Sequence, residues 1–116
     1  MTEKRLTYEN LDVYQCSIQF LALSSEIIDD LPKGNSILLD QLKRASLSIT
    51  LNIAEACGKT SQKDNSRFFA ISRGSAMECG AVLDACRVLK IADERRLLKG
   101  KALIVRIVSM LSKMCR

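Results

Sequence analysis

The sequence contains no histidine, and this absence bears first on catalysis. Histidine is the commonest general base and the commonest protein ligand for metal ions. A chain of 116 residues without one is a poor candidate for acid–base chemistry or for a metal centre. We therefore expect a protein that is not an enzyme and that holds neither a metal ion nor a cofactor.

Disulfide pairing is also poorly supported. The five cysteines are an odd number and include no C-x-x-C pair. Cys79 and Cys86 are seven residues apart on one predicted helix, about 10 Å by helical rise, which is too far for a disulfide. We therefore predict buried free thiols in a reducing cytosol.

Proline, glycine and aromatic residues are scarce: one proline, five glycines and 4% aromatic residues, against 47% hydrophobic residues. This composition suits the packing of helices better than a sheet. No apolar run approaches the ~20 residues of a membrane span, and residues 1–6 do not resemble a signal peptide. We expect one cytoplasmic domain with no membrane partner.

Positive charge is concentrated in the last quarter of the chain. Residues 1–86 hold nine Lys or Arg and eleven Asp or Glu, a net charge of −2. Residues 87–116 hold nine and two, a net charge of +7. The overall charge of +5 therefore belongs to the C-terminal segment.

Helical periodicity divides the chain into four segments. Asn10, Ser61 and Asp93 are predicted helix N-caps, residues 31–35 form a turn, and Gly58 is predicted to end the second helix at a C′ position. The pattern indicates an all-α, up-down-up-down four-helix bundle. The predicted helices span about 11–30, 37–57, 62–89 and 94–114.

The first predicted helix carries two apolar stripes. The first contains Leu11, Tyr14, Ile18, Leu21 and Ile28, and the second contains Val13, Cys16, Phe20, Leu23 and Ile27. A surface helix of a monomer needs only one such stripe. The second stripe indicates either a subunit interface or a helix buried by its own chain, and the pattern does not favour one over the other.

The second and third helices are predicted to interlock. Each has an apolar stripe with small and polar residues beside it, so that the backbones can approach and hydrogen bonds can form across the gap. The predicted stripes are Leu38, Leu42, Ala45, Ile49, Ile53 and Ala56, then Phe68, Ile71, Ser75, Cys79, Val82, Cys86 and Leu89.

The segment from Gln41 to Glu78 resembles the four-helix bundle protein family, also called the 23S rRNA intervening-sequence proteins. The family run is close to Q-x-R-R-A-x-x-S-I-x-x-N-I-A-E-G, followed by R-F-x-x-x-A-x-G-S-x-x-E. The matching residues that we expect to form a structural motif are Gln41, Arg44, Ser48, Asn52, Glu55, Arg67, Gly74, Ser75 and Glu78. Tyr14, Thr50 and Ala56 depart from the usual Trp, Pro and Gly.

This resemblance implies a homopentameric ring of four-helix bundles, a role in binding RNA or DNA, and no catalytic activity. Related proteins are accessory factors of diversity-generating retroelements, where they pair with a reverse transcriptase and its RNA. A reverse transcriptase is therefore a further candidate partner.

The charged motif residues Arg44, Glu55, Arg67, Arg73 and Glu78 are expected to pair with one another in the bundle core, because an unpaired buried charge is costly. A catalytic use would need a nucleophile with a base, which does not accompany them. Arg73 projects away from the predicted stripe, toward solvent or a neighbouring subunit.

The fourth helix has a basic side. Arg95, Lys99, Arg106 and Lys113 recur at intervals of four, seven and seven, which places them on one face. Arg87 and Lys90 extend the positive charge at the end of the third helix. A solvated face and a nucleic-acid-binding face both fit this pattern, and the scarcity of interleaved acids favours the second. Two functions thus remain: electrostatic binding of nucleic acid, RNA above all, or a scaffold that docks a protein.

Overall fold

Four long helices form the structure, which is a computed structural model that describes residues 6–116. A short 3₁₀ helix, Thr7–Asn10, precedes them. The helices are α1 (Asp12–Asp30), α2 (Ser36–Cys57), α3 (Gln62–Val88) and α4 (Glu94–Met114). No strand occurs within the described part of the chain, which confirms the all-α class and the four predicted segments.

Two of the three predicted N-caps are confirmed. The Ser61 hydroxyl accepts a hydrogen bond from the Asp64 N–H at 3.1 Å, and the Asp93 carboxylate accepts one from the Arg96 N–H at 3.1 Å. Each bond satisfies an N–H that the first turn of a helix leaves without a partner. These caps fix where α3 and α4 begin.

The other two predicted boundary residues act differently. Asn10 lies in the 3₁₀ helix, so that Leu11 is the N-cap of α1 and provides no side-chain cap. Gly58 does end α2, but with a φ of −84° it stays in the right-handed region, and its N–H donates to the carbonyl of Ala54. The predicted C′ geometry is wrong, because α2 closes with helical hydrogen bonds instead of a left-handed residue.

Positive φ angles occur at two positions in the connections. Gly34, in the predicted turn, has a φ of +96°, which glycine adopts at little cost. Lys90 has a φ of +55° in the link from α3 to α4. There the Ile91 N–H donates to the Cys86 carbonyl at 3.2 Å, which caps the end of α3.

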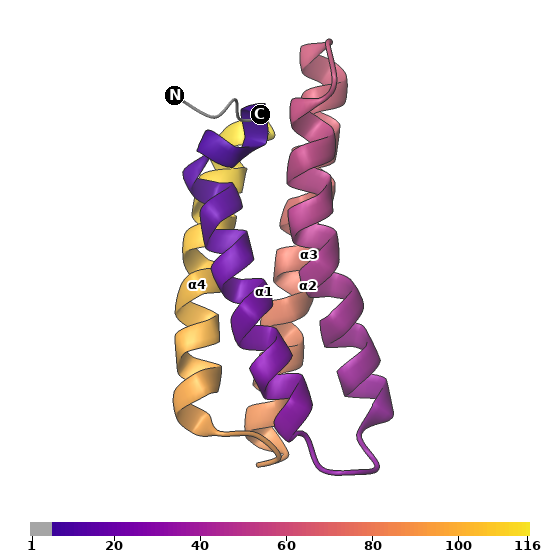
Figure 1. The fold of residues 1–116 in the computed structure, drawn as a ribbon, viewed down its shortest axis with the longest axis vertical. Helices are drawn as coiled ribbons and strands as arrows, with labels where there is room; N and C mark the ends of the chain where they lie inside the picture. The colour runs from indigo at the N-terminus through magenta and orange to yellow at the C-terminus, as the bar shows by residue number, and fades with distance from the viewer. Residues whose placement is uncertain (1–5) are drawn as a thin grey trace, which may run out of the picture.

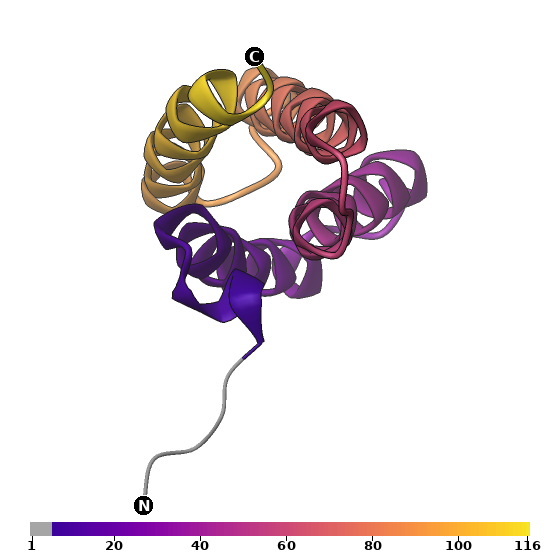
Figure 2. The same cartoon turned by 90° about the horizontal axis from the view of Figure 1, so that it is seen from above.

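The helices lie around one shared core. Each helix contacts its neighbour in the chain, and α4 also contacts α1. Viewed from above, the order around the core is α1, α2, α3, α4 (Figure 2). In Figure 1 the α1–α2 and α3–α4 connections lie at the lower end, whereas the α2–α3 connection and the C-terminus lie at the upper end.

The core is filled mainly by aliphatic side chains from all four helices. The predicted stripe of α2 is confirmed, since five of its six members are buried and Leu38 is half-buried. In α3 the predicted stripe is partly wrong: Ile71 and Leu89 are exposed, whereas Phe69 and Leu83 are buried. Because α3 packs against both α2 and α4, its buried arc is rotated toward α4.

The two stripes of α1 have different surroundings. The stripe of Val13, Cys16, Phe20, Leu23 and Ile27 is buried by the chain's own helices. The other stripe lies mostly half-buried along the α1–α2 seam, with Ile18 38% exposed. The intramolecular alternative therefore accounts for one stripe, and the other keeps some apolar surface.

All five cysteines are free, as predicted, and Cys16, Cys79 and Cys86 are buried while Cys57 and Cys115 are partly buried. Burial raises the pKa of Cys79 to about 12, with a smaller contribution from Glu78. Across residues 6–116, none of the helices has the length and apolar character that a bilayer crossing requires.

Candidate nucleic-acid interface

The basic stripe, which we define as Arg95, Lys99, Arg106 and Lys113, lies along one side of α4. All four side chains are exposed. Six ion pairs occur among the described residues, and none of them includes a member of the stripe. Four charges are therefore presented to solvent without an ion-pair partner in residues 6–116.

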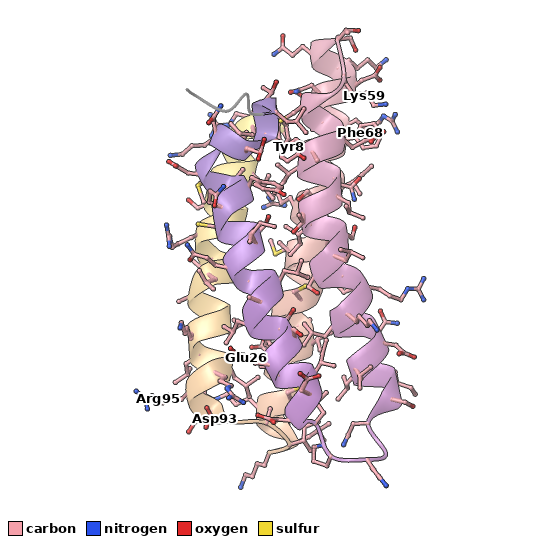
Figure 3. The ribbon with its side chains drawn as sticks, in the orientation of Figure 1. Tyr8, Glu26, Lys59, Phe68, Asp93 and Arg95 are labelled. Atoms are coloured by element: carbon pink, nitrogen blue, oxygen red, sulfur yellow. The ribbon has the colours of Figure 1, made fainter. Side chains whose placement is uncertain are left out.

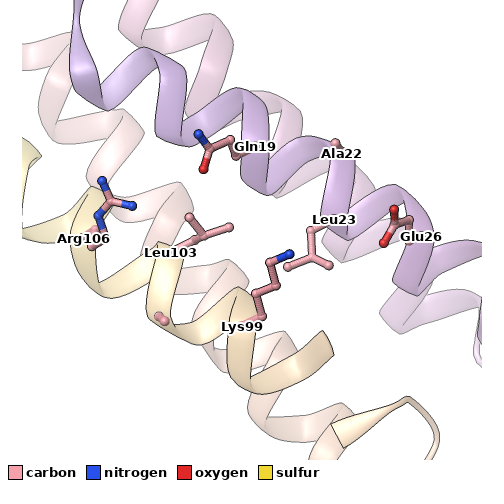
Figure 4. Close-up of a pocket in the computed structure, with 8 residues that line it drawn as sticks. Gln19, Ala22, Leu23, Glu26, Lys99, Leu103 and Arg106 are labelled. Carbon is pink, nitrogen blue, oxygen red and sulfur yellow. The ribbon is translucent and has the colours of Figure 1, made fainter. Parts of the chain in front are cut away.

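The stripe borders the seam between α4 and α1. Lys99 and Arg106 line a groove together with Gln19 and Glu26 of α1 (Figure 4). In the close-up, Lys99 extends from α4 toward Leu23 of α1. The groove floor is apolar and its rims carry the charges, so that an anion lying along the seam would meet the two cations directly.

Both ends of the seam continue this arrangement. Arg95 lines a second groove with Asp93, Arg96 and Glu26, and Figure 3 shows Arg95 and Asp93 at the lower end of α4. At the other end Lys113 shares a shallow groove with Asp12. The stripe thus follows the seam over most of the length of α4.

One arginine neutralises part of the acidic charge of α1. Arg96 hydrogen-bonds Asp30 and lies 3.8 Å from the Glu26 carboxylate. The hydrogen bond that Arg96 donates to Asp30 and the charge of that carboxylate raise the pKa of Arg96 above its usual value. Arg96 consequently shields the stripe from two of the four acids of α1.

Arg87 and Lys90, which were expected to extend positive charge at the end of the third helix, lie outside the basic stripe, and their role in binding nucleic acid stays a prediction. The Arg87 Nε–H donates to the Glu94 carboxylate at 3.0 Å, and the terminal nitrogen Nη2 of Arg87 lies 2.9 Å from the same oxygen. That ion pair joins the end of α3 to the start of α4. Lys90 is exposed in the α3–α4 link, so neither residue continues the stripe along the seam.

The polar core of the structural motif joins α2 to α3 as predicted. The hydroxyls of Ser48 and Ser75 are hydrogen-bonded at 2.7 Å across the two helices. Asn52 donates to the Ser48 hydroxyl at 3.0 Å, and Ser72 donates to the Ile49 carbonyl at 2.8 Å. These bonds confirm the interlocked helix pair.

The charged motif residues do not pair with one another, contrary to expectation. Glu55 pairs with Lys59 at 3.1 Å, and Arg67 lies 4.0 Å from Asp64. The exposed members of the motif are Gln41, Arg44, Glu55, Arg67, Gly74 and Glu78. The helices meet through the serines, so the long side chains of this group extend outward into water. There the solvent compensates the charges of Arg44, Glu55, Arg67 and Glu78.

Three further contacts complete this region. Lys59 and Arg67 lie 4.9 and 4.6 Å from the centre of the Phe68 ring, and Figure 3 shows Lys59 beside Phe68 near the top of α2 and α3. Arg73 donates to the Ser112 hydroxyl of α4 at 2.8 Å. Arg73 is half-buried and reaches α4 of the same chain, so it does not face solvent alone. That it faces a neighbouring subunit stays a prediction.

No group of three or more His, Cys, Asp or Glu side chains with metal-binding geometry occurs in residues 6–116. The feature that sequence reasoning missed is the acidic side of α1, which lies beside the basic stripe. A signal for it was present: α1 holds Asp12, Glu26, Asp29 and Asp30 and no Lys or Arg.

Comparison with known proteins agrees with this geometry. A family model described as 23S rRNA-intervening sequence protein matches residues 9–113. Among solved structures, a crystal structure of a protein of unknown function from the S23 ribosomal protein family of Bacteroides thetaiotaomicron VPI-5482 is similar, with a TM-score of 0.82 at 19% identity. The alignment covers 90% of this chain and 98% of that one, and at this identity it supports the fold alone.

A search of curated proteins found no match. The family model, in contrast, extends from the 3₁₀ helix to the last turn of α4 and so includes the motif and the basic stripe. The chain therefore belongs to the family of 23S rRNA-intervening sequence proteins.

Proposed function

We propose that this protein binds nucleic acid, RNA above all, through the basic stripe of α4, without catalysing a reaction. In this proposal the up-down-up-down bundle is the subunit of a homo-oligomer, a homopentameric ring, which acts in the cytoplasm. Each subunit contributes one stripe, and affinity for a phosphate backbone grows with the number of cationic contacts.

The observation that carries the proposal is the absence of ion pairs at the stripe. Five Lys or Arg residues of the described chain make ion pairs, namely Lys59, Arg67, Arg87, Arg96 and Lys101. The stripe is distinguished because its four unpaired cations share one face of a single helix. Arg95, Lys99, Arg106 and Lys113 belong to none of the six ion pairs of the described chain. Four unpaired like charges repel one another, and binding a phosphate backbone relieves that repulsion.

The chemistry favours binding with little dependence on base sequence. Aromatic platforms that stack on single-stranded bases are absent from the residues that line the two α1–α4 grooves. Tyr8 and Tyr14 pack against each other, with ring centres 4.7 Å apart. Electrostatic contact with phosphates is therefore the expected source of affinity, and RNA is favoured over DNA because the family is named for an rRNA sequence.

A second candidate function is that of a scaffold that docks a protein such as the reverse transcriptase of a diversity-generating retroelement. One observation favours it. Ile37, Val88 and Leu89 are 76%, 79% and 57% exposed, and the start of α2 and the end of α3 lie at the same end of the bundle (Figure 1). Large apolar side chains in such a position suit a protein contact.

Fluorescence anisotropy with a labelled single-stranded RNA tests the first function. The Lys99→Gln/Arg106→Gln variant loses two phosphate contacts of about 0.5–1 kcal/mol each, so we expect affinity to fall about 5- to 30-fold. The matched control is Lys33→Gln/Lys63→Gln, which removes the same charge at exposed positions off the stripe. Equal losses in both variants, or no binding by the parent, would overturn the proposal.

A further inference from the structure

The outer surface of α3 and α4 combines exposed apolar side chains with charges that are already paired. Met77, Leu98 and Val105 are 50%, 49% and 62% exposed. Met77 and Val105 line a groove with Ala81 and Val108 between the two helices, and Leu98 precedes Val105 by seven residues, which places it on the same side of α4. We call these five residues the α3–α4 face.

The charged groups around this face neutralise one another. Asp84 of α3 pairs with Lys101 of α4 at 2.7 Å, and Arg87 pairs with Glu94 at 2.9 Å. Arg73 is held by a hydrogen bond to Ser112. A phosphate backbone gains little from cations that already have partners. An apolar surface with paired charges is instead the composition of a protein–protein contact.

The opposite side of the bundle carries a second apolar groove. Leu21 and Ile28 of α1 and Leu47 of α2 line it, with Leu47 44% and Ile18, one turn before Leu21, 38% exposed. We call these four residues the α1–α2 face. The order of the helices around the core places it across the bundle from the α3–α4 face (Figure 2).

The two halves of the bundle differ in charge. Helices α1 and α2 together hold two Lys or Arg and six Asp or Glu, a net charge of −4. Helices α3 and α4, without the four cations of the basic stripe, hold six Lys or Arg and four Asp or Glu, a net charge of +2. Two like faces brought together would juxtapose halves of the same sign, whereas unlike faces bring opposite signs together.

We infer that the α3–α4 face of one copy of this chain binds the α1–α2 face of a second copy. The inference rests on the homo-oligomeric part of the proposed function and assigns its contact surfaces. Such a head-to-tail contact uses two different patches on each subunit, and it closes into a ring when the rotation between subunits permits.

The size of the faces and the position of the basic stripe agree with this assignment. Helix α4 is about 31 Å long, so two adjacent helices about 10 Å apart offer a footprint of about 600 Å². That is close to the ~800 Å² per partner of a stable interface. The basic stripe lies on the α1 side of α4 and stays outside the contact, so one helix serves both assembly and nucleic-acid binding.

The test is a mixing experiment monitored by size-exclusion chromatography with light scattering, in the absence of nucleic acid. Val105→Glu places a charge on the α3–α4 face and Leu47→Glu on the α1–α2 face. Because both positions are exposed, circular dichroism should show parental helicity. Each variant alone is expected to be monomeric, whereas an equimolar mixture forms a heterodimer through the one contact that remains intact. Gln41→Glu, on neither face, should assemble like the parent.

A monomeric parent, variants that assemble like the parent, or a mixture that stays monomeric would overturn the inference. If either glutamate variant is unfolded, Met77→Glu replaces Val105→Glu and Ile18→Glu replaces Leu47→Glu, with the same expected results. Nucleic-acid affinity is measured separately. Failure of an assembled parent to bind RNA therefore counts against the proposed function and not against the assigned surfaces.

Discussion

Alanine substitutions at two buried glycines should have opposite effects on stability. Gly80 lies within α3 and Gly100 within α4, and both are buried. An added Cβ at Gly80 would lie 3.6 Å from a methyl group of Ile104, an ordinary contact. At Gly100 it would lie 3.0 Å from a methyl group of Leu83 and 3.5 Å from the ring of Phe20.

The magnitudes follow from these distances. Replacing glycine by alanine inside a helix contributes about 1 kcal/mol, and nothing opposes this gain at Gly80. At Gly100 the Leu83 methyl must retreat by about 0.5 Å to reach a normal carbon–carbon separation. Leu83 is itself 1% exposed and has no free space. Overpacking of this kind costs about 1–3 kcal/mol, which cancels or exceeds the helical gain.

Thermal unfolding followed by circular dichroism measures both effects, at one protein concentration because the proposed assembly would make Tm concentration-dependent. We expect Gly80→Ala to raise Tm by about 4 °C. Gly100→Ala should leave the free energy of unfolding unchanged or lower it by up to about 2 kcal/mol. Equal rises in Tm for the two variants would refute the close packing of α4 against α1 and α3.

Four further substitutions test single features of the structure. Glu55→Ala and Glu78→Ala should each lower the free energy of unfolding by less than about 0.5 kcal/mol. The reason is that Glu55 makes only an exposed ion pair with Lys59, and Glu78 makes no ion pair within the described chain. A loss of several kcal/mol in a melting experiment would instead indicate that these side chains are buried in the proposed assembly. Lys90→Gly should raise that free energy by about 0.5–1 kcal/mol in urea titrations, since a left-handed φ is costly for lysine, and a decrease would contradict this conformation. Cys79, with its pKa of about 12, should resist alkylation in the native state at pH 8 and react on unfolding. Its burial should also make stability fall as pH rises above 9, where the unfolded thiol ionises first. A Cys79→Ala variant should show a smaller fall than the parent, because burial raises the pKa of Cys57 and Cys86 as well.

Much of the fold could be predicted because each helix carries its own boundary signals. Ser61 and Asp93 act as N-caps through bonds to residues three positions later, and such local chemistry is visible in the sequence. Asn10 failed as a cap because the preceding residues form a 3₁₀ helix that moves the start of α1 to Leu11. The difference depends on local backbone geometry that residue preference alone does not determine.

The side-chain environment was harder to predict because it depends on how neighbouring helices are rotated. Ile71 has the periodicity of a core residue, yet it is 42% exposed because the buried arc of α3 turns toward α4. The spacing of the basic stripe was sufficient to place it on one face of α4. Its neighbour across the seam was not predictable, because no local pattern specifies that the acidic side of α1 packs beside it.

The salt dependence of RNA binding tests the central claim most directly. Each phosphate contact releases counterions, so the slope of log K against log salt concentration should fall by about 0.7–0.9 in magnitude for each cation removed. Anisotropy across a salt series should therefore give a shallower slope for Lys99→Gln/Arg106→Gln than for the parent, while Lys33→Gln/Lys63→Gln keeps the parental slope. Identical slopes for all three proteins would contradict the assignment of the basic stripe as the nucleic-acid-binding surface.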